Sequence, residues 1–271
     1  MKTETIVHST DANLINSHIQ MPKCILKRFE VNGNFYYYDV EKDIIGSRGH
    51  AKSHNTEKGY YSKEAERFLS DEIESTLGEF LKTIDAIDRH SMHLPIFPNL
   101  DDAIKDYLFS LLTRNPQMVE RINREATYFQ FATKQSQHDT AATGGILIAR
   151  ELGLFKEYTA TLAVNRTDIP FVLPIFGICS MGMNDFNCLI LPLAPFFAGL
   201  LASNTFFSQF SEAFPPYLFI ENMSDVMKIN RNSARAQLQL GYGSIISSDL
   251  VTLKTALQDA RQRLEEGINE D

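Results

Sequence analysis

The sequence has few of the residues that mark secreted, metal-binding or nucleic-acid-binding proteins. Its 271 residues include three cysteines, Cys24, Cys179 and Cys188, without the spacing of a metal site. A disulfide between Cys179 and Cys188 across a hairpin stays open, but free buried thiols in a reducing compartment are the favoured interpretation. The first residues lack the apolar core of a secretory signal, which favours a cytoplasmic location. The formal net charge of −8 disfavours non-specific nucleic-acid binding, because phosphate attraction needs a surplus of Lys and Arg.

Charged side chains are nearly missing from one long tract. Between Asp168 and Glu212 only Asp185 is charged, and the rest is apolar and interrupted by prolines. The longest unbroken apolar piece, residues 188–202, is shorter than the roughly 18 to 20 residues of a membrane-spanning helix. We therefore predict that the tract forms a buried sheet and that the protein has no membrane partner.

Motifs of the common enzyme classes are also missing. Thr143-Gly144-Gly145 lacks the Lys-Ser/Thr pair of a phosphate-binding loop and the third glycine of a dinucleotide fingerprint. No Gly-x-Ser-x-Gly elbow occurs. His50 and His54 have the spacing of one helical turn but fall in a predicted loop, so we predict no metal site. The cofactor is therefore unknown at this stage, and whether the chain is an enzyme stays open.

Hydrophobic periodicity predicts helices on both sides of the charge-poor tract. The clearest helix runs from about Ser62 to Arg89, with Ser62 as its N-cap and apolar residues every three or four positions. A second helix is expected from about Asp101 to Thr113, because Asn115-Pro116 would stop it. Further helices are predicted at residues 22–29, from 116 onward, and at 144–152, 224–239 and 249–264.

Turn signals and β-favouring residues predict the strands. Asn32-Gly33 is typical of a tight turn that leads into a strand over residues 34–40, with which Ile44-Ile45 would pair. Residues 48–59 are polar and are predicted to form a loop. The remaining strands are predicted at residues 158–165, 171–178, 188–193 and 197–201.

These elements predict an α+β fold, namely a helix-rich single domain with a small, buried, mainly antiparallel sheet. We expect a flexible N-terminus over residues 1–16, one integrated domain over 17–266 and a polar tail over 267–271. The last helix has an apolar stripe from Leu250 to Leu264 that is nearly heptad-spaced. This stripe predicts either a homodimer through the C-terminal helix or, more commonly, docking of the helix on its own domain.

Polar residues next to apolar segments are the candidates for a functional site. The candidate catalytic residues are Asp168, His18, Arg114 and Glu66. Asp168 stands directly before the charge-poor tract, and Arg114 ends a predicted helix. Both also have a structural explanation, Asp168 as a turn residue and Arg114 as a cation that compensates a helix dipole.

Two further polar residues are candidates for ligand binding, Glu74 and Asn230. Glu66 and Glu74 lie close to the apolar stripe of the long helix, so each carboxylate needs a partner. Arg114 or His18 would supply one. The structural alternatives are a capping or packing role for His18 and a helix cap or break at Asn230.

A series of short motifs follows in order along the chain. The motifs are Ser17-His18-Ile19-Gln20-Met21-Pro22, Tyr38-Asp39, Gly59-Tyr60-Tyr61-Ser62, Arg114-Asn115-Pro116, Thr167-Asp168-Ile169-Pro170, Leu191-Pro192-Leu193-Ala194-Pro195 and Ile229-Asn230. In this order they resemble the bacterial domain-of-unknown-function 4238 family over about residues 17 to 250. Lys23 and Ile19 depart from the residues that many relatives have there. The resemblance implies one integrated domain and supplies no activity or cofactor.

Two functions remain as hypotheses. The first is a polar cleft in which His18, Glu66, Arg114 and Asp168 converge to bind or hydrolyse a phosphate-bearing or other anionic substrate. Asp168 or Glu66 would act there as a base or metal ligand, and Arg114 would hold the anionic group. A role in bacterial defence would suit such a site, although no motif supports it. The alternative is a non-enzymatic interaction module with an exposed apolar patch in residues 196–210 or in the stripe of residues 250–264.

Overall fold

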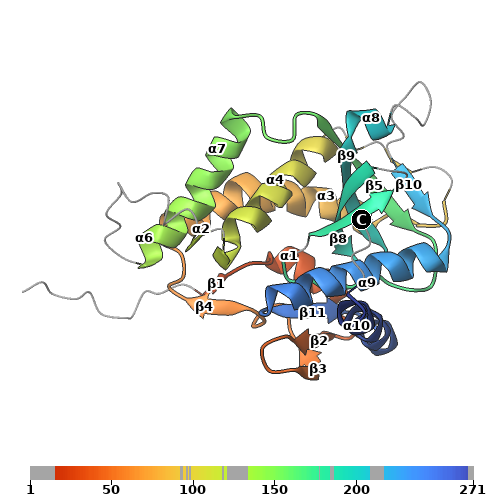
Figure 1. Cartoon of the computed structure of the whole chain (residues 1–271). Helices are drawn as coiled ribbons and strands as arrows, with labels where there is room; N and C mark the ends of the chain where they lie inside the picture. Colours follow the sequence, from red (N-terminus) through yellow and green to blue (C-terminus); the bar gives the residue numbers. More distant parts are fainter. Residues whose placement is uncertain are drawn as a thin grey trace, which may run out of the picture.

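The computed structural model describes residues 16–91, 94–95, 97, 99–117, 119–120, 134–176, 178–183, 186–207 and 217–267. Their arrangement is α+β, as predicted, with three antiparallel or mixed sheets and helices around them. The helices that precede residue 152 gather on one side of the molecule, and the largest sheet lies on the other (Figure 1). The predicted N-terminal and C-terminal extensions lie almost wholly outside the described residues, so their boundaries stay predictions.

The charge-poor tract forms most of a five-stranded sheet, which confirms the prediction of a buried sheet. Its order is β10-β5-β9-β8-β7, with β10 parallel to β5 and the other neighbours antiparallel. Its strands are β5 (Tyr158–Asn165), β7 (Cys179–Met183), β8 (Phe186–Ala194), β9 (Phe197–Ser203) and β10 (Tyr217–Ile220).

Helices cover both faces of this sheet. Leu162 and Leu201 on one face belong to a core with Ile104 of helix α4 (Leu100–Arg114). Ala163 and Leu200 on the other face belong to a second core with Ile229 of helix α9 (Met223–Leu240). A sheet that is buried on both faces needs no polar alternation, which explains the continuous apolar run in the sequence.

A four-stranded antiparallel sheet lies beneath α9 in the order β3-β2-β11-β6 (Figure 1). Its strands are β2 (Phe35–Asp39), β3 (Ile44–Gly49), β6 (Leu173–Pro174) and β11 (Ser244–Ser247). The predicted turn before β2 is confirmed, because Asn32 and Gly33 have positive φ angles of 54° and 78°. Two successive positive φ angles are the hallmark of a type I′ turn.

The strand predicted at residues 171–178 is wrong except for β6. The backbone N–H groups on either side of β6 are bound by side chains of α9: Val172 N donates to Asn230 Oδ1 and Phe176 N to Gln237 Oε1. These side-chain acceptors replace the strand partner that the apolar sequence implied.

The loop predicted at residues 48–59 is also partly wrong. Strand β4 (Thr56–Lys58) pairs antiparallel with β1 (Asn16–His18), and Gly49 still belongs to β3. The local sequence is polar, so this strand exists because of a partner that is distant in the sequence.

The predicted helices are confirmed, except that the helix predicted to about Arg89 already ends at Asp85. Most of the helix predicted from residue 116 onward lies outside the described residues. The α-helices are α1 (Lys23–Leu26), α2 (Lys63–Phe68), α3 (Ser75–Asp85), α4 (Leu100–Arg114), α6 (Lys134–Asp139), α7 (Gly145–Glu151), α8 (Asn204–Phe207), α9 (Met223–Leu240) and α10 (Leu250–Glu265). A 3₁₀ turn, Lys27–Phe29, continues α1, and π-helical segments Leu69–Glu74 and Thr140–Gly144 join α2 to α3 and α6 to α7. Ser62 caps α2, since its hydroxyl accepts a hydrogen bond from Ala65 N at 3.1 Å.

The apolar stripe of α10 docks on its own chain. Leu253, Leu257 and Ala260 are buried in a core that includes Tyr38 of β2 and Ile245 of β11. In the apolar patch that the sequence suggested in residues 196–210, Phe197 to Ala202 are buried in the core, and the side chains of residues 206–210 lie outside the described part. The homodimer through the C-terminal helix stays a prediction.

Two further observations concern the tract and the cysteines. Within the described residues, no helix combines the length and apolarity that crossing a bilayer requires. Cys179 and Cys188 are buried free thiols on the neighbouring strands β7 and β8, and Cys24 is also free.

Candidate functional site

Four of the six candidate residues come together where β1, the α2–α3 helix and α4 meet. His18 ends β1, Glu66 lies in α2, Glu74 ends the first π-helical segment and Arg114 ends α4. Arg114 influences the pKa of both His18 and Glu66, so the charged groups lie within electrostatic range of one another. We call these four residues the Arg114 cluster. α4 points its C-terminal end toward β1 and α6 (Figure 1).

The π-helical segment positions the two carboxylates. Glu66 and Glu74 are eight positions apart. In a regular α-helix that separation leaves the second residue about 80° away from the face of the first. Hydrogen bonds from i to i+5 rotate the chain less per residue, which turns Glu74 back toward the face of Glu66. The segment therefore places both carboxylates beside Arg114.

Arg114 is the centre of the cluster and is only 1% exposed. Its Nη2 donates one hydrogen bond to Glu74 Oε1 at 3.1 Å, and its Nε is buried without a hydrogen-bond partner among the described residues. An arginine–carboxylate pair commonly uses two parallel bonds, and a buried donor without an acceptor is costly. The guanidinium is therefore incompletely satisfied by the described protein groups.

Other polar atoms at the cluster are unsatisfied as well. His18 Nδ1 and Ser110 Oγ are buried without a partner among the described residues, and Ser110 lies one helical turn before Arg114. Buried polar groups in native proteins nearly always have a partner, so each exception needs an explanation such as a bound ligand or water. Among the described residues, Asn232 and Ser233 of α9 are exceptions elsewhere, whereas Arg114 Nε, His18 Nδ1 and Ser110 Oγ belong to this region.

The environment shifts the pKa values of Glu66 and His18 in opposite directions. Burial raises the pKa of Glu66, and the nearby Arg114 charge opposes this shift. Burial lowers the pKa of His18, and the Glu74 charge opposes that shift. Burial thus favours the protonated carboxyl of Glu66 and the unprotonated imidazole of His18.

Neighbouring hydroxyl and thiol groups stay protonated. Burial raises the pKa of Tyr61 and of Tyr107, and Arg114 opposes both shifts. Burial raises the pKa of the Cys24 thiol to about 11. A thiol with this pKa holds little thiolate near neutral pH, so Cys24 is unsuited to act as a nucleophile.

A second π-helical segment borders the same cluster. Asp139, directly before it, accepts a hydrogen bond from Ser62 N at 2.9 Å. His138 stacks on Tyr60 with ring centroids 3.8 Å apart, and Gln135 donates to the carbonyl oxygen of Tyr61 at 3.1 Å. π-helical segments occur frequently at functional sites. These contacts hold the chain in front of α2 and thereby fix the position of Glu66.

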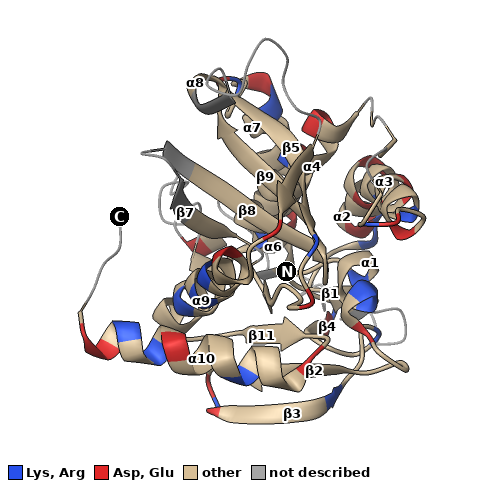
Figure 2. Ribbon diagram, turned by 90° about the vertical axis from the view of Figure 1, so that its right-hand side faces the viewer, with Lys and Arg blue, Asp and Glu red and all other residues tan. Residues whose placement is uncertain are grey.

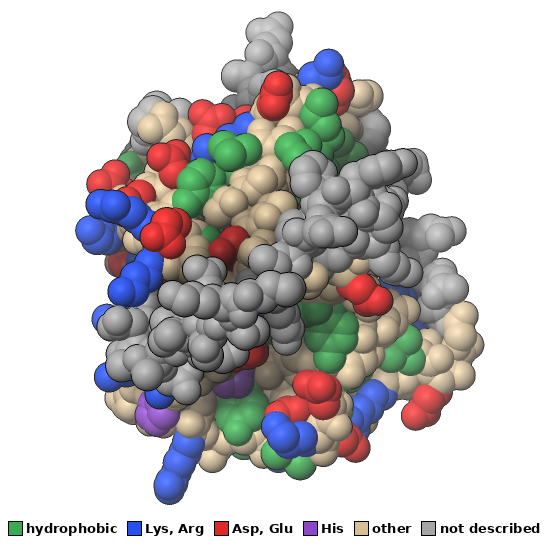
Figure 3. Space-filling model, turned by 90° about the vertical axis from the view of Figure 1, so that its left-hand side faces the viewer, with side chains coloured by type: hydrophobic (Ala, Val, Ile, Leu, Met, Phe, Trp, Pro, Cys, Tyr) green, Lys and Arg blue, Asp and Glu red, His purple; other side chains and the backbone are tan. Residues whose placement is uncertain are grey.

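The cluster is not sealed from solvent, since the Glu74 side chain is 30% exposed. Figure 3 shows the face of the molecule on which the helices before residue 152 lie, with acidic and basic side chains mixed over its described surface. Solvent therefore reaches the carboxylate that pairs with Arg114.

Asp168 is not part of the cluster, which corrects the sequence-based site. Its side chain is 90% exposed and pairs with Arg89 at 3.3 Å. Arg89 lies over the ring of Phe196 and donates to the carbonyl oxygens of Asn165 and Thr167. Asp168 is thus the turn residue that its structural explanation proposed, at the end of β5.

Asn230 is also placed elsewhere. Its amide is buried, accepts a hydrogen bond from Val172 N at 2.9 Å and donates one to Pro170 O at 2.8 Å. Both ends of the amide are occupied by backbone, so its role is to attach α9 to the charge-poor tract. Ligand binding at Asn230 is not supported by this geometry.

Sequence reasoning missed Ser110, Asp139 and His138. Ser110 and His138 sit among apolar or helical residues without a motif. Tyr61 does fall in the segment Gly59-Tyr60-Tyr61-Ser62 that carries part of the family resemblance. Within the described residues, no three His, Cys, Asp or Glu side chains are grouped as a metal site would require.

No protein-family model matches the sequence, and neither a curated protein nor a solved structure is significantly similar to it. The resemblance to the domain-of-unknown-function 4238 family therefore stays a prediction.

Proposed function

We propose that the Arg114 cluster binds and hydrolyses a small anionic substrate, such as one that carries a phosphate group. The observation that carries this proposal is the buried guanidinium of Arg114, whose Nε has no acceptor among the described residues. An oxygen of a phosphate or carboxylate group is the acceptor that a guanidinium fits best. A bound anion would accept the hydrogen bond of Arg114 Nε, because Glu74 accepts only from Nη2.

The charges of the cluster permit an anion to enter. Glu74 and Arg114 form an ion pair and cancel each other. Burial shifts the pKa of Glu66 and of His18 toward the neutral form in both cases. The upward shift of the Glu66 pKa lowers the repulsion between this carboxylate and an incoming anion.

The same groups supply proton transfers for hydrolysis. His18 would accept a proton from a water molecule as the water oxygen forms its bond to the substrate. Glu66 would give its proton to the leaving oxygen as the bond to that oxygen breaks. Arg114 would stabilise the negative charge throughout. Hydrolysis changes no oxidation state, so no redox partner is needed. One proton passes from water to His18 and one from Glu66 to the leaving oxygen, so the step balances.

Substitution of the cluster tests this function. We expect Glu66→Gln and His18→Gln to lower hydrolysis of p-nitrophenyl phosphate by about 10²-fold each, the usual contribution of a general acid or base. Arg114→Lys should weaken binding of inorganic phosphate in calorimetry, because lysine cannot supply the fork of donors.

The matched control is Asp168→Asn, which removes an exposed carboxylate outside the cluster. It should leave turnover and phosphate binding unchanged. The function is wrong if the unmodified protein neither turns over this substrate nor binds phosphate, or if Asp168→Asn has the same effect as Glu66→Gln.

An interaction module remains the second candidate, now at a different place. Four large apolar side chains in or just after α7 are exposed: Leu147, Ile148, Leu152 and Leu154. Several such side chains within eight positions are typical of a contact surface. If substitution of these four side chains abolishes binding of a partner and leaves substrate turnover unchanged, the interaction function is distinguished from hydrolysis at the Arg114 cluster.

A further inference from the structure

β3 is an exposed edge of the four-stranded sheet. It pairs with β2 on one side, and no described strand pairs with its other side. Ile44 and Ile45 are 48% and 43% exposed, and in Figure 2 β3 runs along the outer margin of the molecule beside α10. Native proteins usually protect an edge with charge, proline or a covering element. An exposed apolar edge is a ready template for one more strand.

A groove of about 570 Å³ lies between this hairpin and α10. Leu257 and Tyr38 are nearly buried and form an apolar lining, and Ile45 stands on the side of β3. Gln258 of α10 adds an amide that can donate and accept hydrogen bonds. The groove thus offers an apolar floor with polar walls, as peptide-binding grooves do.

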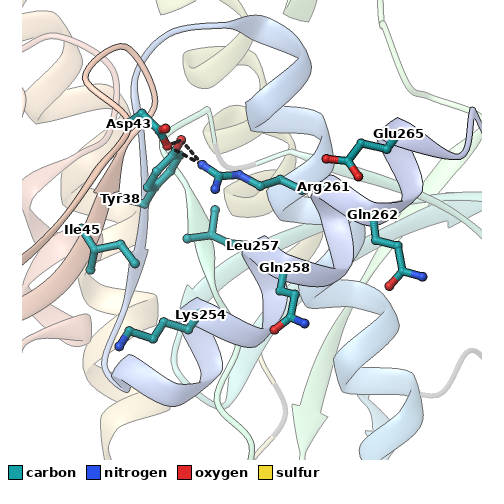
Figure 4. A pocket seen from close by; sticks show the side chains of 9 residues that line it. All are labelled: Tyr38, Asp43, Ile45, Lys254, Leu257, Gln258, Arg261, Gln262 and Glu265. Atoms are coloured by element: carbon teal, nitrogen blue, oxygen red, sulfur yellow. Dashed lines mark hydrogen bonds and ion pairs between the residues drawn. The ribbon is translucent and has the colours of Figure 1, made fainter.

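Arg261 holds the two walls at a fixed distance. Its Nη2 donates to the Tyr38 hydroxyl at 2.7 Å and to Asp43 Oδ1, so the guanidinium joins α10 to the hairpin (Figure 4). Because these contacts are already present in the free protein, a ligand would not have to order the walls first.

The charges at the two ends of the groove are unmatched. Lys254 lies at one end and Glu265 at the other, and neither forms an ion pair within the described residues (Figure 4). They are eleven positions apart in α10, which corresponds to about 16 Å along the helix axis. The first and fifth residues of an extended chain lie about 13 Å apart, and the long side chains of Lys254 and Glu265 span the remaining distance.

We propose that the outer edge of β3 binds an extended segment of a partner protein as one more strand, whose alternate side chains enter the groove between β3 and α10. The segment has an acidic side chain opposite Lys254, an apolar one over Leu257 and a basic one opposite Glu265. Alternate residues of a strand face the same way, so positions one, three and five of the segment supply these side chains.

A second copy of β3 fits this groove less well. Arg48 is the only charged residue in Ile44–Gly49, so a second copy of the strand has no carboxylate for Lys254. The charge pattern therefore favours a different protein as the partner.

Fluorescence anisotropy with a labelled peptide tests the proposal on the full chain. The probe is acetyl-Asp-Thr-Val-Thr-Lys-amide, whose blocked ends carry no charge. We expect Lys254→Glu to weaken its binding about fivefold and to make the protein prefer the peptide with Lys at both ends, because both ends of the groove are then acidic. Lys82→Glu, the same change on the exposed surface of α3, should have no effect.

A second variant tests the pairing with β3 itself. Ser47 has no register partner on β2, so Ser47→Pro blocks the outer edge while it leaves the paired residues in place. We expect binding to fall at least about tenfold while circular dichroism stays unchanged. The proposal is overturned if the probe does not bind below about 1 mM, if Lys254→Glu leaves both affinities unchanged, or if sedimentation shows a dimer that Ser47→Pro dissociates. The last result would make a second copy the occupant.

Discussion

At the scale of single residues, His54 is an imidazole that packs against two aromatic rings of β2. His54 packs edge-on against Phe35 with centroids 5.1 Å apart and lies 5.0 Å from Tyr37. Burial lowers the pKa of His54 to about 4, and the Asp39 charge opposes this shift. The folded protein therefore excludes the charged form of this imidazole in the range where the unfolded chain accepts a proton.

His54 should make the protein sensitive to acid. A lowered pKa in the folded state gives stability above the unfolded pKa of about 6.5, and that stability is lost as the pH falls toward 4. The shift corresponds to about 3 kcal/mol. Between pH 7 and pH 4 the unfolding free energy of the wild type, from urea denaturation, should therefore fall. In His54→Gln we expect this fall to be smaller by about 3 kcal/mol.

The control for this prediction is the exposed His90, since His90→Gln should keep the acid sensitivity of the wild type. Equal pH dependence in His54→Gln and wild type would contradict the role of His54.

At the scale of elements, the long helical region from residue 63 to 85 depends on how it begins. Ser62 accepts from Ala65 N, and Ser62 N donates to Asp139. One residue thus caps α2 and attaches it to α6. The π-helical segment that follows then sets the rotation of Glu74 relative to Glu66. A displaced start of α2 would therefore also displace these two carboxylates of the Arg114 cluster.

Removal of the cap should destabilise the protein. Ser62→Ala deletes the hydroxyl acceptor, which usually costs about 1 kcal/mol. We expect that loss in urea unfolding at pH 7. Ser70→Ala, an exposed serine in the same region, should change the unfolding free energy by less than about 0.5 kcal/mol. Equal effects of the two substitutions would show that the cap is not responsible.

At the scale of the whole molecule, α9 is the element that joins the two larger sheets. It packs against the five-stranded sheet through Ile229 and against the core beneath it through Ala234. Figure 1 shows it between the two sheets. Asn230 binds backbone groups on both sides of residue 171, which fixes the path of the chain from one sheet to the other.

Loss of the Asn230 amide should therefore weaken the whole fold. Asn230→Ala leaves Val172 N–H and Pro170 C=O buried without partners, at a cost of about 1 to 3 kcal/mol for each unsatisfied group. We expect a fall in unfolding free energy of roughly 2 to 5 kcal/mol in urea denaturation, with one cooperative transition. Gln262→Ala, at an exposed part of α10, is the control and should stay within about 0.5 kcal/mol of wild type. A change of that small size in Asn230→Ala would show that the amide does not hold the sheets together.

Much of the candidate site follows from residues that the sequence marks as unusual. Glu66 and Glu74 beside an apolar stripe need a partner, and the structure provides Arg114 to Glu74 at 3.1 Å. The prediction that Asp168 belongs to the same site is wrong, because its position before the apolar tract is equally well explained by a turn. The difference between the two cases is burial, which a pattern predicts for a helix face but not for the end of a strand.

The sequence by itself determined the local elements: the turn at Asn32-Gly33, the cap at Ser62, the helical stripes and the buried character of the charge-poor tract. Each depends on a local property of residues that lie close together in the chain, namely φ preference, capping or periodicity. Only the tertiary structure decided that β4 is a strand, that α10 docks on its own chain and that His18, Glu66, Glu74 and Arg114 meet. These outcomes depend on contacts between distant segments, whose free energy no short stretch of sequence contains.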